Sequence, residues 1–114
     1  MAQAVHAGFL FALEHPEATD QWMHDSQFLV VVAVRDEHAL LDLAESAEGI
    51  RHTVWHEPDL RHYREDKSAP ATAVALEPSR EARRLCSSMP LAPHRFHLTS
   101  SIPPVTLSRA VVTL

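Results

Sequence analysis

The stretch Met1-Ala2-Gln3-Ala4-Val5-His6-Ala7-Gly8 begins the chain with small and apolar residues around two polar side chains. Alanine is the strongest helix former, so the stretch predicts a helix that carries Gln3 and His6 on one face. Two such side chains can point at a common target, and the unpaired N–H groups of a helix start attract anions. The stretch is therefore a candidate site. The plainer alternative is an incidental histidine at a helix start.

Periodicity and proline positions divide the rest of the chain into short elements. We expect helices over residues 2–14, 16–24, 37–47 and 80–88, and strands over residues 28–34, 51–56 and 71–76. Pro16 separates the first two helices. Strands that alternate with helices indicate an α/β fold, a three-layer α/β/α domain with a mixed, mostly parallel sheet of three to four strands.

Two of these elements carry more detailed expectations. Phe28 to Val34 is a continuous apolar run, which is typical of a strand buried on both faces. Asp36 is placed to cap the third helix, with Leu40, Leu41 and Leu43 facing inward.

The character of the chain changes after Met89, where four prolines interrupt a region without helical periodicity. We therefore expect a domain over residues 1–92 and an irregular C-terminal tail over residues 93–114. Within the tail, Val105–Leu114 has the β-branched content of a strand, without an obvious place in the sheet.

Composition limits the class of protein. The chain has 114 residues, enough for one domain, and it contains no apolar run long enough to span a membrane. It lacks the basic and apolar regions of a signal peptide, and its single cysteine, Cys86, fits a reducing compartment. These features predict a cytoplasmic protein without a membrane partner. We expect Cys86 to be a structural thiol.

Charge is distributed unevenly along the chain. The net charge is −5, but residues 1–50 hold nine acidic residues and one basic residue, whereas residues 51–114 hold six acidic and nine basic residues. A surface built from the second half can still attract phosphates. The candidate phosphate-binding residues are Arg61, Arg64, Lys67, Arg80, Arg83 and Arg84. An ordinary solvated surface is the alternative.

Further candidates lie at strand ends. Glu57 and Asp59 follow the second predicted strand, where their carboxylates can act as acid or base or orient a water, and Thr72 opens the next strand. A solvated turn is the simpler interpretation. His52, His56 and His62 suggest zinc, but their spacing does not follow the usual rules for zinc ligands, and we predict no metal and no cofactor.

The segments also resemble a known family. Ala2-Gln3-Ala4-Val5-His6-Ala7 resembles the Ala-Gln-x-x-His-Ala signature of the type 2 (archaeal and eukaryotic type) peptidyl-tRNA hydrolases. Trp55-His56-Glu57-Pro58 is similar to a Trp-x-Glu-Pro element in one subgroup of hydrolase-domain proteins. The remaining matches, which extend the resemblance to about residue 92, are Phe28–Val32, Asp36–Leu41 and Thr72–Pro78.

This resemblance implies a mixed four-stranded sheet, a frequent dimer, and metal-free hydrolysis of the ester that joins a peptide to the tRNA 3′ end. By position, Glu57 corresponds to an active-site aspartate of the family, Thr72 to a threonine that opens the last strand, and Gln3 and His6 to the helix motif. We therefore expect Gln3, His6, Glu57, Asp59 and Thr72 to be catalytic, with Glu57 orienting or deprotonating a water.

The chain departs from the family pattern in one important respect. The family's first strand and its active-site lysine would precede Met1, and they are absent from this sequence. We consider three explanations: a start codon upstream of Met1, a gene remnant, or a strand at Val105–Leu114 that fills the vacant place in the sheet. We favour the first.

The sequence as a whole predicts a peptidyl-tRNA hydrolase-like protein that acts on tRNA as a homodimer, with activity impaired in the chain as given because the upstream strand and lysine are absent. The alternative is an inactive family member or a truncated remnant that serves as a binding module.

Overall fold

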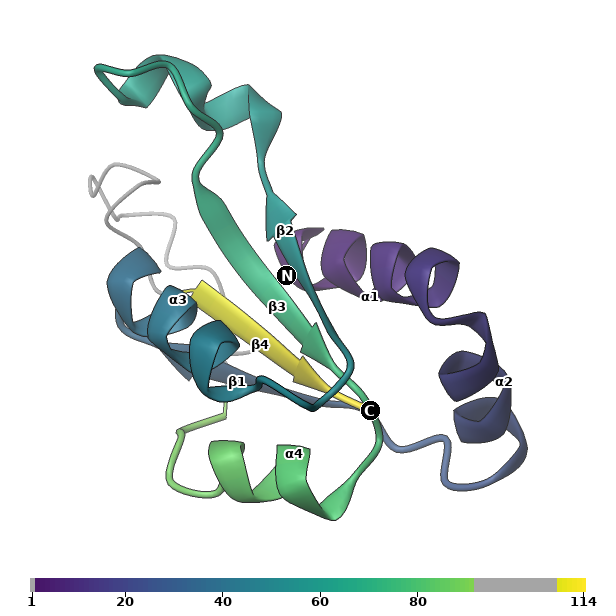
Figure 1. The fold of residues 1–114 in the computed structure, drawn as a ribbon. Coiled ribbons are helices and arrows are strands. Elements are labelled where there is room, and N and C mark those ends of the chain that lie inside the picture. The colour runs from purple at the N-terminus through teal and green to yellow at the C-terminus, as the bar shows by residue number, and fades with distance from the viewer. Residues whose placement is uncertain (1, 92–108) are drawn as a thin grey trace.

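The computed structural model describes residues 2–91 and 109–114. These residues form a four-stranded sheet with helices on both faces (Figure 1). The helices are α1 (Ala2–Glu14), α2 (Pro16–His24), α3 (Glu37–Ser46) and α4 (Arg80–Cys86), with a 3₁₀ helix η1 at Pro58–Tyr63. The strands are β1 (Val30–Val34), β2 (His52–His56), β3 (Ala71–Leu76) and β4 (Arg109–Thr113).

The strands lie in the order β1-β4-β3-β2. β3 and β4 pair in parallel, whereas β1 with β4 and β2 with β3 pair antiparallel. The predicted α/β class and mixed sheet are confirmed, but the expectation of mostly parallel strands is wrong. β2 and β3 are antiparallel because the connection between them, residues 57–70 (the excursion), contains no crossover helix.

β3 is the centre of the structure, and all six of its residues are buried. Its Val74 faces a core with Leu40 and Leu43 of α3, while Ala73 and Ala75 face a second core with α1. The alternating side chains of one strand thus serve both helical layers. This arrangement confirms the predicted three-layer packing.

β1 is the element that differs most from expectation. It begins at Val30 rather than Phe28 and lies at the edge of the sheet, where Val32 is its buried residue. Phe28, Leu29 and Val30 are 75%, 52% and 40% exposed. The prediction that this run is buried on both faces is therefore wrong. Hydrophobicity shows that the side chains of this run are suited to burial. The position of β1 at the edge of the sheet leaves several of them without neighbours to cover them.

The sequence predicts the third helix more accurately than this strand. The Asp36 carboxylate accepts a hydrogen bond from the N–H of Ala39 at 2.9 Å, which confirms the predicted cap of α3. Leu40 and Leu43 are buried as expected, but Leu41 is 42% exposed, which corrects the prediction that it faces inward. Consecutive residues lie about 100° apart around a helix, so Leu40 and Leu41 do not share its buried face.

The C-terminal strand occupies an interior place. Residues 92–108, which include most of the predicted tail, lie outside the described residues. Residues 109–113, however, form β4 between β1 and β3, so this part of the chain is not an irregular tail. The end of the Val105–Leu114 segment thus forms a strand, as its β-branched content predicts, and this strand lies in the interior of the sheet.

No helix within the described ranges 2–91 and 109–114 has the length and apolarity needed to cross a membrane.

The interior position of β4 predicts a specific stability difference. Val111 is fully buried, whereas Val30 on the edge strand is 40% exposed. We expect V111A to lower the free energy of unfolding by about 2 kcal/mol, from lost apolar burial and the remaining cavity. The matched V30A variant should change it by less than about 0.5 kcal/mol. Urea titration measures both values, and equal effects would contradict the interior placement of β4.

Candidate active site

Glu57 is the buried carboxylate of the site. It directly follows β2, where the pairing with β3 shifts register between Trp55 and His56. Its own N–H donates to the carbonyl of Pro70 at 2.9 Å, and its side chain accepts from the N–H of Asp59 at 3.4 Å as the cap of η1. Glu57 is 6% exposed, so strand end and cap hold a charged group inside the protein.

Side chains from two other parts of the chain meet this carboxylate. Trp55 Nε1 donates to Glu57 Oε2 at 2.9 Å, and His6 Nδ1 lies 3.5 Å from the same oxygen. The Gln3 side chain also forms a hydrogen bond with Glu57. The rings of His6 and Trp55 contact each other, with centroids 4.8 Å apart and planes inclined by 47°. Glu57 thus gathers donors from α1 and β2.

The environment keeps Glu57 ionised. Burial by itself raises the pKa of Glu57, but the hydrogen bonds from Trp55 and Asp59, the nearby His6 and the hydrogen bond from Gln3 together outweigh it. The net pKa lies below the ordinary value of 4.5. A carboxylate stabilised in this way is a weak base, and it is better suited to orient a neighbouring group than to remove a proton from water.

Gln3 links Glu57 to the start of β3. The hydroxyl of Thr72 donates to Gln3 Oε1 at 2.7 Å, which directs the amide of Gln3. Thr72 itself is 4% exposed, so its hydroxyl contacts Gln3 and is shielded from solvent. The two residues are 69 positions apart in the sequence, and packing of α1 against β3 brings them together.

Four of the five predicted catalytic side chains therefore form one cluster, namely Gln3, His6, Glu57 and Thr72. Asp59 contributes its backbone N–H, while its side chain is exposed beside the cluster. The prediction assigned no role to Trp55. The available signal was its spacing, because residues two apart on a strand point to the same side, which places Trp55 and Glu57 together at the strand end.

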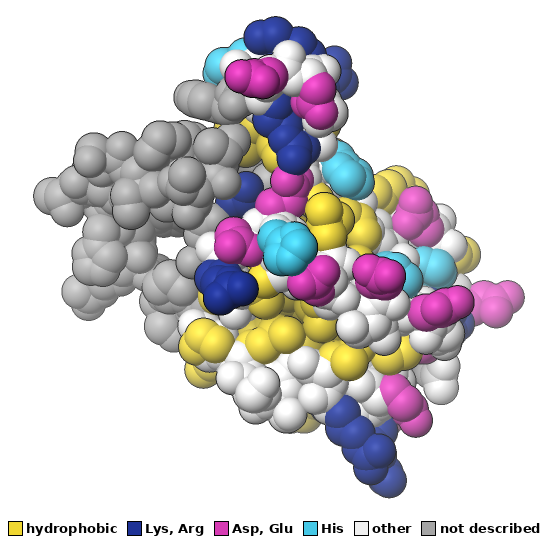
Figure 2. All heavy atoms as spheres, turned by 60° about the vertical axis from the view of Figure 1, so that its left-hand side comes forward, with side chains coloured by type: hydrophobic (Ala, Val, Ile, Leu, Met, Phe, Trp, Pro, Cys, Tyr) yellow, Lys and Arg dark blue, Asp and Glu magenta, His cyan; other side chains and the backbone are white. Residues whose placement is uncertain are grey.

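The predicted phosphate-binding residues divide into two groups. Arg61, Arg64 and Lys67 lie on the excursion that follows Glu57, at the top of Figure 1. Arg80, Arg83 and Arg84 lie on α4, at the bottom of that figure and on the opposite face of the sheet from α1. Figure 2 shows basic side chains at the top and at the bottom of one face, with acidic, histidine, hydrophobic and further basic side chains between them. The two groups do not form one patch.

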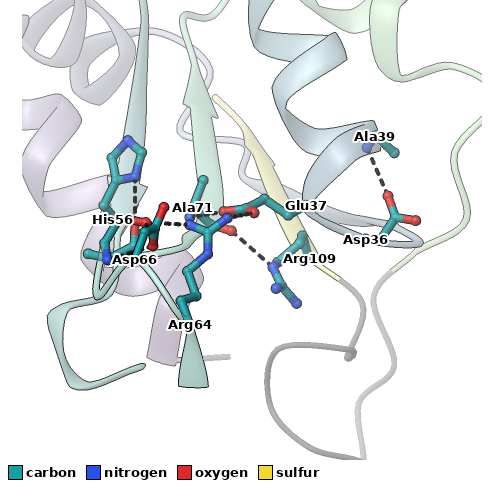
Figure 3. A network of polar contacts seen from close by, with 10 residues as sticks. Asp36, Glu37, Ala39, His56, Arg64, Asp66, Ala71 and Arg109 are labelled. Atoms are coloured by element: carbon teal, nitrogen blue, oxygen red, sulfur yellow. Dashed lines mark hydrogen bonds and ion pairs between the residues drawn. The ribbon is translucent and has the colours of Figure 1, made fainter. Parts of the chain in front are cut away.

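A second polar cluster anchors the excursion (Figure 3). Glu37 at the start of α3 pairs with Arg64 and accepts a hydrogen bond from the N–H of Ala71 at 2.6 Å. Arg109 is 3% exposed and donates from Nε to the carbonyl of Ala71 at 3.0 Å. Burial lowers the pKa of Arg109, although Glu37 and Asp36 act in the opposite direction. This cluster joins α3, β3, β4 and the excursion, and the sequence prediction missed it because its members are far apart along the chain.

The remaining candidate residues described by the structure, His52, His56 and Cys86, have contacts typical of structural residues. The ring nitrogens Nδ1 of His52 and His56 bond to the carbonyls of Ile50 and Ala69. Among residues 2–91 and 109–114, no three His, Cys, Asp or Glu side chains are grouped as metal ligands. Burial raises the pKa of the Cys86 thiol, which is 7% exposed, so Cys86 is set up as a packed thiol rather than a nucleophile.

Comparison with known proteins identifies one family. The family model described as peptidyl-tRNA hydrolase PTH2 matches residues 1–87, which contain all elements from α1 to α4 and every side chain of the cluster around Glu57. β4 lies beyond the matched span. No curated protein and no solved structure gives a significant match to the chain.

The lowered pKa of Glu57 predicts how stability depends on pH. A carboxylate with a depressed pKa in the folded state stabilises the protein above its unfolded pKa, and this contribution is lost as pH falls through the folded value. We expect E57Q to be less stable than the wild type at pH 7, by about 1–3 kcal/mol for the disturbed buried hydrogen bonds. The difference should shrink as pH falls below the ordinary value of 4.5 and through the lower folded pKa, where the wild-type carboxylate becomes protonated.

Urea titrations from pH 3 to pH 8 measure this difference, and the exposed Glu65 gives the control variant E65Q. A difference between E57Q and wild type that stays constant across this range would contradict the assigned pKa direction.

The cluster around Glu37 gives a second prediction. E37A removes the acceptor for the Ala71 N–H and the partner of Arg64, so we expect a loss of about 1–3 kcal/mol in the free energy of unfolding. The control D42A breaks an exposed pair with His38, 3.4 Å long, and should cost less than about 0.5 kcal/mol. Chemical denaturation compares the two variants, and a loss for E37A no larger than for D42A would show that the cluster does not anchor the excursion.

Proposed function

The chain belongs to the PTH2 family of peptidyl-tRNA hydrolases, and from this premise we propose that it hydrolyses the ester between a peptide and the 3′ end of tRNA. The observation that carries the proposal is the cluster of Gln3, His6, Glu57 and Thr72, in which one buried carboxylate holds a half-exposed histidine and an amide. Ester hydrolysis requires a positioned water, a proton acceptor and a donor to the developing oxyanion.

Glu57 provides the fixed negative charge of the site. Because its pKa is depressed, it orients the groups around it and stabilises positive charge that develops on them. Asp59, exposed beside it, keeps Glu57 in place through its backbone N–H. The lowered pKa of Glu57 therefore supports an orienting role better than the predicted role, in which Glu57 deprotonates a water.

Gln3 is suited to the oxyanion. Its carbonyl oxygen accepts from the Thr72 hydroxyl and one amide N–H is directed to Glu57, so the other amide N–H is the part left to face a substrate. A preorganised donor of this kind typically contributes a factor of about 10²–10³ to the rate of acyl transfer. Thr72 is then a positioning residue that acts through Gln3.

The excursion provides the nearer phosphate contacts. Arg61 and Lys67 are exposed and follow Glu57 within a few residues, whereas Arg64 is engaged with Glu37. We assign tRNA phosphates first to this group. Arg80, Arg83 and Arg84 on α4 would serve a more distant part of the tRNA, and salt should weaken both sets of contacts.

A homodimer is part of the proposal. α1 exposes Val5, Phe9 and Leu13, by 49%, 71% and 79%, at positions that repeat every four residues, and such apolar patches are usually covered. Since tRNA is the proposed substrate, we also place the protein in the cytoplasm.

The enzyme proposal is tested with a peptidyl-tRNA. Purified protein is incubated with N-acetyl-phenylalanyl-tRNA, and release of the labelled amino acid is measured. We expect hydrolysis by the wild type and a loss of about 10²–10³ in kcat for Q3A, the variant without the oxyanion donor. The variant E81Q, at an exposed position of α4 with no part in the proposed site or phosphate contacts, should retain the wild-type kcat.

Binding of the tRNA without release of the amino acid would overturn the enzyme proposal and favour the alternative, a family member that acts as a binding module. Equal rates for Q3A and wild type would overturn the role of Gln3.

A further inference from the structure

The contact between His6 and Glu57 differs from two other histidine–carboxylate pairs in the described structure. His24 with Asp20 and His38 with Asp42 are spaced four residues apart on single helices, and their side chains are 63–80% exposed. In the pair of His6 and Glu57, the carboxylate side chain is 7% exposed and comes from a distant part of the chain. Exposed ion pairs contribute little to stability, whereas water screens the electrostatic field of a buried carboxylate less strongly.

The geometry fixes which nitrogen of His6 faces the carboxylate. Nδ1 lies 3.5 Å from Glu57 Oε2, and the ring of Trp55 packs against the imidazole at 4.8 Å between centroids. A carboxylate accepts only, so it favours the tautomer that carries the proton on Nδ1. The lone pair then lies on Nε2, on the side of the ring away from Glu57, and the His6 side chain is 46% exposed.

Trp55 contacts both Glu57 and His6. Its indole N–H donates to Oε2, the same oxygen that faces His6, and thereby limits rotation of the carboxylate. Trp55 also contacts the imidazole directly. One side chain therefore positions both members of the pair. This combination of a proton acceptor, an orienting carboxylate and a third group that fixes the carboxylate is what a general base requires.

We infer that His6 is the group that carries the proton in the proposed hydrolysis, and that Glu57 and Trp55 hold its ring with Nε2 turned toward the substrate. Trp55 is a positioning residue, since it acts through Glu57 and His6. The inference rests on the proposed function for its reaction, while the holding of the ring is a property of the protein alone.

The proton transfers balance as follows. The oxygen of a water molecule forms a bond to the ester carbonyl carbon while one of its protons passes to His6 Nε2. The resulting imidazolium lies beside the Glu57 carboxylate, which stabilises its charge. The tetrahedral intermediate then breaks its bond to the ribose oxygen, which takes the proton from Nε2. The products are the free carboxylic acid of the peptide and the 3′-terminal ribose hydroxyl, and His6 is again neutral.

The first experiment tests the holding of the ring without substrate. In ¹⁵N-labelled protein at pH 8, the imidazole ¹⁵N shifts distinguish the two neutral tautomers, and the spectrum of H6N assigns the signals of His6. We expect the Nδ1–H tautomer to predominate in the wild type and a mixture in W55F and E57Q. The control W22F also removes an indole donor, one bonded to the Phe28 carbonyl at 2.6 Å, and should leave the signals of His6 unchanged.

The second experiment tests proton transfer with N-acetyl-phenylalanyl-tRNA. We expect H6A to lose about 10²–10⁴ in kcat, and added imidazole to restore part of it. H24A, which removes an exposed histidine of similar pairing, should retain the wild-type rate. W55F should lose about tenfold in kcat with little change in KM, the equivalent of one hydrogen bond.

The outcomes separate the two claims. If H6A keeps the wild-type rate, His6 does not carry the proton. If the tautomer of His6 is mixed in the wild type, or is the same in W55F, the positioning role of Trp55 is wrong. If the wild type does not hydrolyse the substrate, the proposed function and the proton-carrying role fail together, and the tautomer measurement still decides whether Glu57 and Trp55 hold the ring.

Discussion

The packing of α1 on β3 is the constraint on which both the core and the site depend. Ala4 and Ala7 of the helix share one buried cluster with Ala73 and Ala75 of the strand, and small side chains on both elements allow their backbones to approach closely. This approach places the start of α1 over the start of β3. Gln3 consequently reaches Thr72, and His6 reaches the carboxylate at the end of β2.

A buried charge is tolerated at Glu57 because several donors converge on it. Removing a carboxylate from water costs several kcal/mol unless hydrogen bonds and opposite charge replace the lost hydration. Trp55, Asp59, Gln3 and His6 provide this replacement, and the pKa of Glu57 falls despite burial. The same contacts that stabilise the carboxylate also orient the amide of Gln3 and the ring of His6. The stability of the buried carboxylate and the orientation of Gln3 and His6 therefore depend on one set of contacts.

The C-terminal strand helps to hold the backbone at the start of β3. β4 lies between β1 and β3, and its first residue, Arg109, donates to the Ala71 carbonyl immediately before Thr72. Glu37 holds the N–H of the same Ala71. Two elements far from the site in sequence thus fix the backbone at the start of β3, where the hydroxyl that directs Gln3 is located.

The sequence by itself determined the local elements and much of the site. Helical periodicity, Pro16 and the Asp36 cap located the helices to within about two residues, and the order of motifs identified the family and the cluster of Gln3, His6, Glu57 and Thr72. Only the tertiary structure decided that β1 lies at an edge, that β4 lies in the interior, and that Trp55 and Arg109 serve the site and its support. The hydrogen bonds and caps of a helix depend on residues a few positions apart, so a local sequence pattern can predict them. Strand order and burial of a charge depend instead on contacts between residues dozens of positions apart, and no local pattern records them.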